Sequence, residues 1–303
     1  MYKLKVIECG YCYAKWRAEM VNGCEVLTSG IRPFKGPRAI DYIRDKGTFD
    51  RANCDIEFYQ VSHLKELAMQ PAVAITRDYS NAVCSGIRDG RKIMAIGGYC
   101  NYAPAIVGGL QRALGKDTSI GVVWMDAHSD NVVVEETDGP VRLVGVPVST
   151  MLGQTLPSYR VEVCGLEEPL KGSNMIMSDI RIMNESGAGH MEEAGVIHLD
   201  ASQYDNTKCW KEHVHELAER VDVIFLMVDA DILKYDYIPS YEKRVPYGHD
   251  LETVQRNVEA VLRTGKVEAM ATFCFDFDHY DNDHERTSES LRRIIEAALD
   301  NWN

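Results

Sequence analysis

The chain has 303 residues, of which 45% are hydrophobic and 26% charged, and its formal net charge at pH 7 is −13. This is the composition of a globular protein with enough apolar residues for a large core. The acidic balance argues against nucleic acid and anionic membranes as partners and is compatible with a cationic or neutral substrate, although solubility alone is the simpler explanation.

The nine cysteines are scattered along the chain, and several, such as Cys164 and Cys274, lie in apolar runs. We therefore expect free thiols in a reducing compartment and no disulfide framework. Cys9 and Cys12 form a CxxC pair, but no second pair follows at zinc-ribbon spacing. The first residues lack a signal-peptide pattern, and no apolar run approaches the length of a membrane span, so we expect a cytoplasmic protein.

Strand patterns and helical patterns alternate along the chain. In chain order we expect strand 3–9, helix 35–47, strand 54–62, helix 81–92, strand 93–98, helix 101–115, strand 119–130, strand 175–182, helix 189–195, strand 195–200, helix 208–221, strand 222–233, helix 250–265, strand 267–277 and helix 287–302. Pro37 starts the first helix, and Thr287 or Ser288 caps the last. The loop over 131–143 is expected to form a hairpin or a lid.

This alternation predicts an α/β fold with a mostly parallel, doubly wound sheet that helices cover on both faces. No repeat, low-complexity tract or change of composition marks a boundary, so we expect one domain over residues 1–303. In open sheets of this kind, ligands bind beyond the carboxyl ends of the strands. The residues that follow each strand are therefore the first place to look for a site.

Groups that can bind metal ions follow two strongly apolar strands. Asp126, His128 and Asp130 occupy alternate positions after the run "GVVWM", and Asp229 and Asp231 follow "VIFLMV". Alternate side chains of a strand point the same way, so these groups are expected to converge. Buried carboxylates cost several kcal/mol unless they are paired or metal-bound. Four oxygen ligands and one imidazole suit Mn²⁺ and allow two ions, whereas the alternative is that these acids cap helices or line a solvated loop.

These motifs resemble those of the ureohydrolase superfamily, which includes arginase, agmatinase and formiminoglutamase. "DAHSD" at 126–130 is similar to the family's DAHxD, and "VDADIL" at 228–233 to its strand-end DxD, while "KGPRAIDYIR", "IGGYCN" and "VPYGHD" match more weakly in the same chain order. The resemblance implies a three-layer α/β/α sandwich and a homo-oligomer. It also implies that Asp126 and Asp229 bridge two metal ions, that His128 and Asp231 complete one site, and that Asp130 belongs to the other.

The chain departs from the family pattern close to the expected ions. Cys100 stands where the family has a histidine ligand. Either Cys100 binds metal as a thiolate, which favours softer ions than Mn²⁺, or it is a small buried thiol that leaves the site weakened. Val132 replaces an asparagine that holds the amino-acid head of arginine, and Val144 replaces an acid–base histidine, so we expect a drier pocket than that of arginase.

Late in the chain, the family places an acidic residue against the substrate guanidinium, and Asp276 or Asp278 are the candidates here. His249 and His279 are candidates for the missing acid–base histidine, although a surface or loop position is the simpler expectation for each. His213 and His215 lie on an expected helix and are expected to be solvated.

Together, the ligand set and the resemblance predict a metal-dependent hydrolase that cleaves a C–N bond of a small guanidine, amidine or formimino compound by metal-activated hydroxide, and that is not a standard arginase. His128 would act through the ions, Asp130 would take the proton from the attacking water, and Asp276 or Asp278 would hold the cationic nitrogen. The alternatives are an inactive protein of the same fold with a structural or regulatory role, and a metalloenzyme of this fold with different chemistry.

Overall fold

The computed structural model describes residues 2–11, 16–28, 30, 38–183, 185–241, 243–276 and 284–302. Its centre is an eight-stranded sheet in the order β4-β1-β5-β11-β10-β6-β8-β9, in which every pair of neighbours is parallel. The strands are β1 (Tyr2–Glu8), β4 (Cys54–Gln60), β5 (Lys92–Ile96), β6 (Ile120–Met125), β8 (Met175–Ser178), β9 (Ile197–Leu199), β10 (Val223–Asp229) and β11 (Val267–Phe273).

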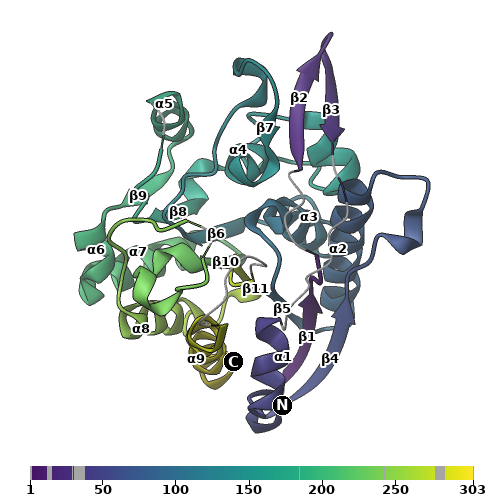
Figure 1. Ribbon diagram of the computed structural model, residues 1–303. Coiled ribbons are helices and arrows are strands. Elements are labelled where there is room, and N and C mark those ends of the chain that lie inside the picture. The colour runs from purple at the N-terminus through teal and green to yellow at the C-terminus, as the bar shows by residue number, and fades with distance from the viewer. Residues whose placement is uncertain are drawn as a thin grey trace.

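Helices cover both faces of this sheet (Figure 1), which makes a three-layer α/β/α sandwich. The helix pair α2 and α3 lies on one face, and α1, α7, α8 and α9 lie on the other. The helices are α1 (Ala39–Asp45), α2 (Pro71–Arg88), α3 (Ala103–Leu114), α4 (Pro147–Met151), α5 (Glu185–Ala194), α6 (Ala201–Asp205), α7 (Thr207–Arg220), α8 (Leu251–Leu262) and α9 (His284–Asn301). Among the described residues, we find no helix with the length and apolar character needed to cross a membrane.

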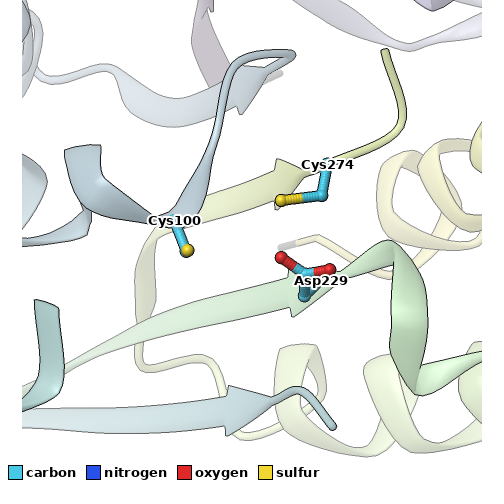
Figure 2. A group of neighbouring side chains, drawn as sticks. All are labelled: Cys100, Asp229 and Cys274. Carbon is cyan, nitrogen blue, oxygen red and sulfur yellow. The ribbon is translucent and has the colours of Figure 1, made fainter. Parts of the chain in front are cut away.

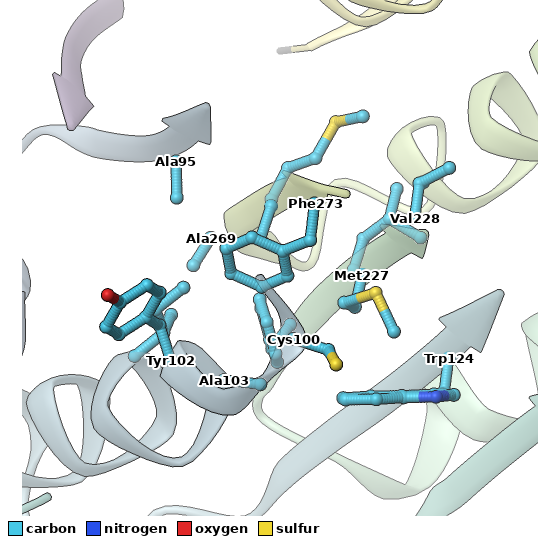
Figure 3. Packing of buried hydrophobic residues seen from close by; sticks show 14 of the residues in the cluster. Ala95, Cys100, Tyr102, Ala103, Trp124, Met227, Val228, Ala269 and Phe273 are labelled. Carbon is cyan, nitrogen blue, oxygen red and sulfur yellow. The ribbon is translucent and has the colours of Figure 1, made fainter. Parts of the chain in front are cut away.

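The predicted α/β fold with a parallel, doubly wound sheet is confirmed. Every residue of β6 and β8 is buried, as expected for strands with helices on both faces. Apolar side chains of β6, β10 and β11, among them Trp124, Met227 and Phe273, pack together directly beneath the carboxyl ends of these strands (Figure 3). This packing gives the loops that follow the strands a rigid base.

A second, three-stranded antiparallel sheet was not predicted. It contains β2 (Arg17–Val21), β3 (Cys24–Thr28) and β7 (Val141–Arg142) in the order β3-β2-β7. Asn22 and Gly23 join β2 to β3 with φ angles of 50° and 77°, which is the backbone that an Asn-Gly hairpin turn requires. The loop over 131–143 therefore does not form a hairpin of its own, because its end pairs with β2 as β7.

Two expected helix boundaries also need correction. The last helix begins at His284, so Thr287 and Ser288 lie inside it and do not cap it. Instead, the Thr287 hydroxyl accepts a hydrogen bond from the Ser240 hydroxyl, at 2.6 Å between the oxygens. The helix expected over 81–92 is the second half of the longer α2. Pro37 and Cys12 lie outside the described residues, so the helix start and the CxxC pair stay predictions.

Candidate metal centre

Four neighbouring parallel strands bring the candidate ligands to one edge of the sheet. β5, β11, β10 and β6 are adjacent in this order, so their carboxyl ends open on the same side. A cavity of about 500 Å³ lies there. It is lined by Tyr99, Cys100, Asp126, His128, Asp130, Arg142, Val144, Ile182, Asp229, Tyr241, Lys243, Arg244, Val245 and Cys274. Each of the four strands contributes at least one group at or just beyond its end.

Asp126, His128 and Asp231 form the first group of possible ligands, with ligand atoms within 4.8 Å of one another. The His128 Nδ1 lies 2.7 Å from Asp231 Oδ2 and 3.7 Å from Asp126 Oδ1. Asp231 is oriented further, because its carboxylate accepts hydrogen bonds from the backbone N–H of Ala127 at 2.9 Å and from the hydroxyl of Tyr241 at 2.8 Å. These oxygen and nitrogen donors fit Mn²⁺.

In the absence of a metal ion, His128 supplies the positive charge of this group. Burial lowers the pKa of His128, but its hydrogen bonds to Asp126 and Asp231 outweigh burial and raise that pKa to about 12. The same contacts hold the pKa of Asp231 below its usual value against the effect of burial. A metal ion takes neutral imidazole, so it would replace the proton of His128.

Three carboxyl groups of the cluster, those of Asp126, Asp130 and Asp229, are buried without enough positive charge to balance them. Burial and the neighbouring acids raise the pKa values of Asp126 and Asp229 well above the usual range. Burial also raises the pKa of Asp130 to about 7, although the charge of His128 opposes this shift. Among the described residues, Oδ2 of Asp126 and Oδ2 of Asp130 have no hydrogen-bond partner. Buried oxygens of this kind are what a cation would satisfy.

These shifts predict that the metal-free protein loses stability as pH rises. A carboxyl group with a raised pKa keeps its proton to a higher pH in the folded state than in the unfolded state. The free energy of unfolding therefore falls as pH rises from the unfolded to the folded pKa value. For Asp130 this interval runs from about 4 to about 7. With a chelator present, thermal unfolding should occur at a lower temperature at pH 8 than at pH 5. Asp130→Asn should reduce this difference, and an unchanged pH dependence in that variant would contradict the assignment.

Cys100, Asp229 and Cys274 form a second group, whose ligand atoms also lie within 4.8 Å of one another (Figure 2). All three side chains are buried. Cys100 was predicted as a possible ligand, but Cys274 was not, because a thiol inside the run "MATFCF" has the pattern of an ordinary core residue. The only sequence signal was its position at the end of an apolar strand, where the other candidate ligands also lie.

Asp276 is not among the described residues that line the cavity, and its role as a substrate contact stays a prediction. Its Oδ1 accepts a hydrogen bond of 2.7 Å from the backbone N–H of Ala39, the first residue of α1. The left-handed backbone of Cys274, with φ of 63°, ends the strand alternation that would have aimed Asp276 into the cavity. Asp278 and His279 lie outside the described residues, so their roles stay predictions.

His249 lies in the loop before α8, as expected, but it is buried and is not among the described residues that line the cavity. It is 4% exposed, and its ring nitrogens lie 2.8 Å from Asp179 Oδ2 and 2.7 Å from Asp205 Oδ1. Its backbone N–H donates to the carbonyl of Ile232 at 2.9 Å, in the segment just after Asp231. His249 therefore supports the loop that carries Asp231 and does not reach a substrate.

The two valines that replace family residues occupy different places. Val144 lines the cavity, and its carbonyl lies 3.4 Å from the Sγ of Cys100. Val132 is not among the cavity-lining residues, and its backbone N–H donates to the carbonyl of Gly145 at 2.9 Å. The prediction of a more apolar pocket therefore depends on Val144 and not on Val132.

The fold and the site together define a class of proteins: three-layer α/β/α sandwiches with acids, an imidazole and thiols clustered beyond the carboxyl ends of a parallel sheet. A model of the arginase family matches residues 29–299 of this chain. The chain belongs to the arginase family.

Relatives and solved structures of the family agree with this assignment. The chain is 27% identical to a formimidoylglutamase of Psychrobacter cryohalolentis over 73% of its own length and 64% of that protein, and 23% identical to an arginase of Staphylococcus aureus over 65% and 69%. It thus spans about two thirds of the length of these relatives. An arginase structure from Bacillus caldovelox superposes with a TM-score of 0.80 at 19% identity, covering 99% of this chain and 98% of that one. A formimidoylglutamase structure from Bacillus subtilis gives a TM-score of 0.72 at 14% identity, covering 99% and 87%.

Proposed function

We propose that the protein is a metal-dependent hydrolase that cleaves a C–N bond in a small guanidino, amidino or formimino compound. The observation that carries this proposal is that Asp126, His128, Asp130 and Asp229 line a cavity large enough for a small molecule, with the buried Asp231 in contact with His128 behind them. Family membership supports the same type of reaction, as do relatives named arginase and formimidoylglutamase.

Within this proposal, each described residue has a definite task. A divalent ion bound by Asp126, His128 and Asp231 would lower the pKa of a water molecule and polarise the substrate carbon. Asp130 is suited to accept a proton at its Oδ2, because the residue lines the cavity and this oxygen has no hydrogen-bond partner among the described residues. Tyr241 would fix the orientation of Asp231 through its hydroxyl group. The clustering of buried acids argues against the alternative of an inactive protein, in which nothing would offset their cost.

The rim of the cavity favours a substrate that also carries a carboxylate. Arg142, Lys243 and Arg244 line the opening, and none of them forms an ion pair with any acidic group in the described part of the chain. Three exposed positive charges beside the cavity, on a chain of net charge −13, change the substrate expected from composition alone. The acids at the floor and the cations at the rim together fit a molecule with a nitrogen-bearing carbon at one end and an anionic group at the other.

Charge neutralisation at the rim should therefore raise KM for an anionic substrate. The triple variant Arg142→Gln, Lys243→Gln, Arg244→Gln removes three exposed contacts, which together are worth about tenfold in KM. KM for a neutral analogue and kcat for both compounds should change little. Lys211→Gln, on α7 and outside the cavity, is the matched control. Equal effects on charged and neutral substrates would contradict the role of the rim.

The general proposal is tested by a substrate screen. The full chain, loaded with Mn²⁺ or Zn²⁺, is incubated with guanidines, amidines and formimino compounds, and release of urea, ammonia or formamide is measured. We expect turnover of at least one compound with a carboxylate. Absence of turnover across the panel by protein with a full complement of metal would contradict the proposal. We further propose, from the free thiols of the eight described cysteines and from the family resemblance, a homo-oligomer in a reducing, cytoplasmic setting.

A further inference from the structure

Two thiols and a carboxylate converge in the half of the cavity next to β11. Cys100, Cys274 and Asp229 come from the ends of β5, β11 and β10, and their side chains face one another across a small space (Figure 2). Their ligand atoms all lie within 4.8 Å of one another, and each residue is at most 5% exposed. Such a group is too polar to be explained as core packing, because Asp229 is a buried carboxyl group.

The backbone holds the two thiols in place. Cys274 has a left-handed conformation, with φ of 63°, which costs a residue other than glycine of the order of 1–2 kcal/mol. Its N–H donates to the carbonyl of Gly98 at 2.9 Å, which fixes β11 against the loop that carries Cys100. Gly98 itself has φ of 81°, and a Cβ there would lie 3.0 Å from the Cβ of Cys9. Strain of this kind is characteristic of sites where side-chain direction matters.

A second observation points to a cation in this half of the cavity. Asp130 lines the cavity together with both thiols, is 9% exposed, and has an Oδ2 without a hydrogen-bond partner among the described residues. Removing this oxygen from water is unfavourable unless something positive meets it. His128, the nearby cationic side chain, already pairs with Asp231.

We propose that Cys100, Cys274 and Asp229 form a thiolate-rich site for a thiophilic divalent ion of the Zn²⁺ class, and that this site discriminates against Mn²⁺. Sulfur ligands favour zinc and related borderline ions, whereas Mn²⁺ prefers oxygen and nitrogen. Three protein ligands with an open position facing a cavity are the arrangement of a zinc site that also binds a small molecule. The neighbouring group, Asp126, His128 and Asp231, has no sulfur donor. The two groups of ligands are therefore expected to differ in the ions that they prefer. This inference concerns binding and does not require the proposed hydrolysis.

Cobalt(II) is the probe for this site, because it substitutes for Zn²⁺ and its bonds to thiolates give an intense near-ultraviolet charge-transfer band. The full chain is stripped of metal, kept reduced and titrated with Co²⁺ under anaerobic conditions. We expect the thiolate band to appear in the wild-type protein. Cys274→Ser and Cys100→Ser should each abolish it or strongly reduce it. Cys84→Ser is the matched control, because Cys84 is also buried but lies on α2 outside the cavity, and it should leave the band unchanged.

Metal content gives a second readout that does not depend on activity. Dialysed against Zn²⁺, the wild-type protein should retain zinc at this site, and Cys274→Ser should lose one equivalent of zinc; dialysed separately against Mn²⁺, both proteins should bind the same amount of manganese. Circular dichroism establishes that each variant is folded. The proposal is overturned if Co²⁺ binds without a thiolate band, if the band persists in Cys274→Ser, or if the two thiols form a disulfide that reductant does not convert into a metal site. These results bear only on the thiolate site, so they separate its failure from that of the hydrolase.

Discussion

Asp126→Asn is expected to abolish hydrolysis and to lower the affinity for divalent ions by at least about 100-fold, since losing a metal ligand costs more than losing a group that only orients one. The substitution keeps the Oδ1 that accepts the backbone N–H of His128 at 2.7 Å, so the turn after β6 is preserved. It removes the negative charge and the Oδ2, which has no hydrogen-bond partner among the described residues. Calorimetric titration with Mn²⁺ measures the loss directly.

The stability of Asp126→Asn shows whether Asp126 acts as a metal ligand or is needed for folding. Because Asp126 is buried among other acids, its charge destabilises the metal-free protein. Metal-free Asp126→Asn should therefore be at least as stable as the wild-type protein, although it no longer gains stability from added metal. Asp117→Asn, an exposed aspartate after α3, is the control and should bind metal normally. A large loss of stability in metal-free Asp126→Asn would assign this residue to folding.

His249→Ala is expected to lower the free energy of unfolding by about 3 kcal/mol, since it leaves the buried Asp179 without one of its partners. The His249 and Asp179 side chains are 3% and 6% exposed, so water cannot replace the lost contact. The ring also packs against Tyr204, with centroids 4.3 Å apart. Urea denaturation measures the change.

His249→Ala should also lower the affinity for metal ions. His249 is tied by backbone hydrogen bonds to Ile232 and Lys234, which follow Asp231 directly. Gly248 packs so closely on this segment that a Cβ would lie 2.5 Å from the carbonyl of Leu233. Metal affinity should therefore fall by about tenfold, as for groups that orient a ligand. His215→Ala, whose side chain is 73% exposed on α7, should change stability by less than about 0.5 kcal/mol. If His249→Ala lost no more stability or metal affinity than His215→Ala, His249 would not support the loop that carries Asp231.

Much of the fold was predictable from sequence because the central strands β5, β6, β10 and β11 are short apolar runs, each followed by polar or thiol groups. A parallel sheet brings Asp126 and His128 near Asp231, as the motifs suggested, although β6 ends at Met125 and strand alternation does not extend to Asp130, whose φ is 46°. Part of the small antiparallel sheet could also have been predicted, since Asn22-Gly23 is a strong hairpin signal. It was missed because its strands are short and half-exposed.

The remaining features depend on contacts between distant segments. His249 meets Asp179 and Asp205, which are 70 and 44 residues away, and no local pattern shows that these three side chains share a buried space. Cys274 has the sequence context of a core residue, and only the adjacency of β5 and β11 brings it to Cys100. The contact between the Asp276 carboxylate and the backbone N–H of Ala39 joins segments far apart in the chain, so no local pattern could predict it.

The central claim is that the side chains beyond β5, β6, β10 and β11 bind divalent cations. Anomalous diffraction from crystals of the full chain grown separately with Mn²⁺ and with Zn²⁺, recorded at the absorption edge of each metal, tests it most directly. We predict a manganese peak beside Asp126, His128 and Asp231 in crystals grown with Mn²⁺ alone, and a zinc peak between Cys100 and Cys274 in crystals grown with Zn²⁺. A cavity without anomalous scattering at either edge, in crystals with each metal in excess, would contradict the account.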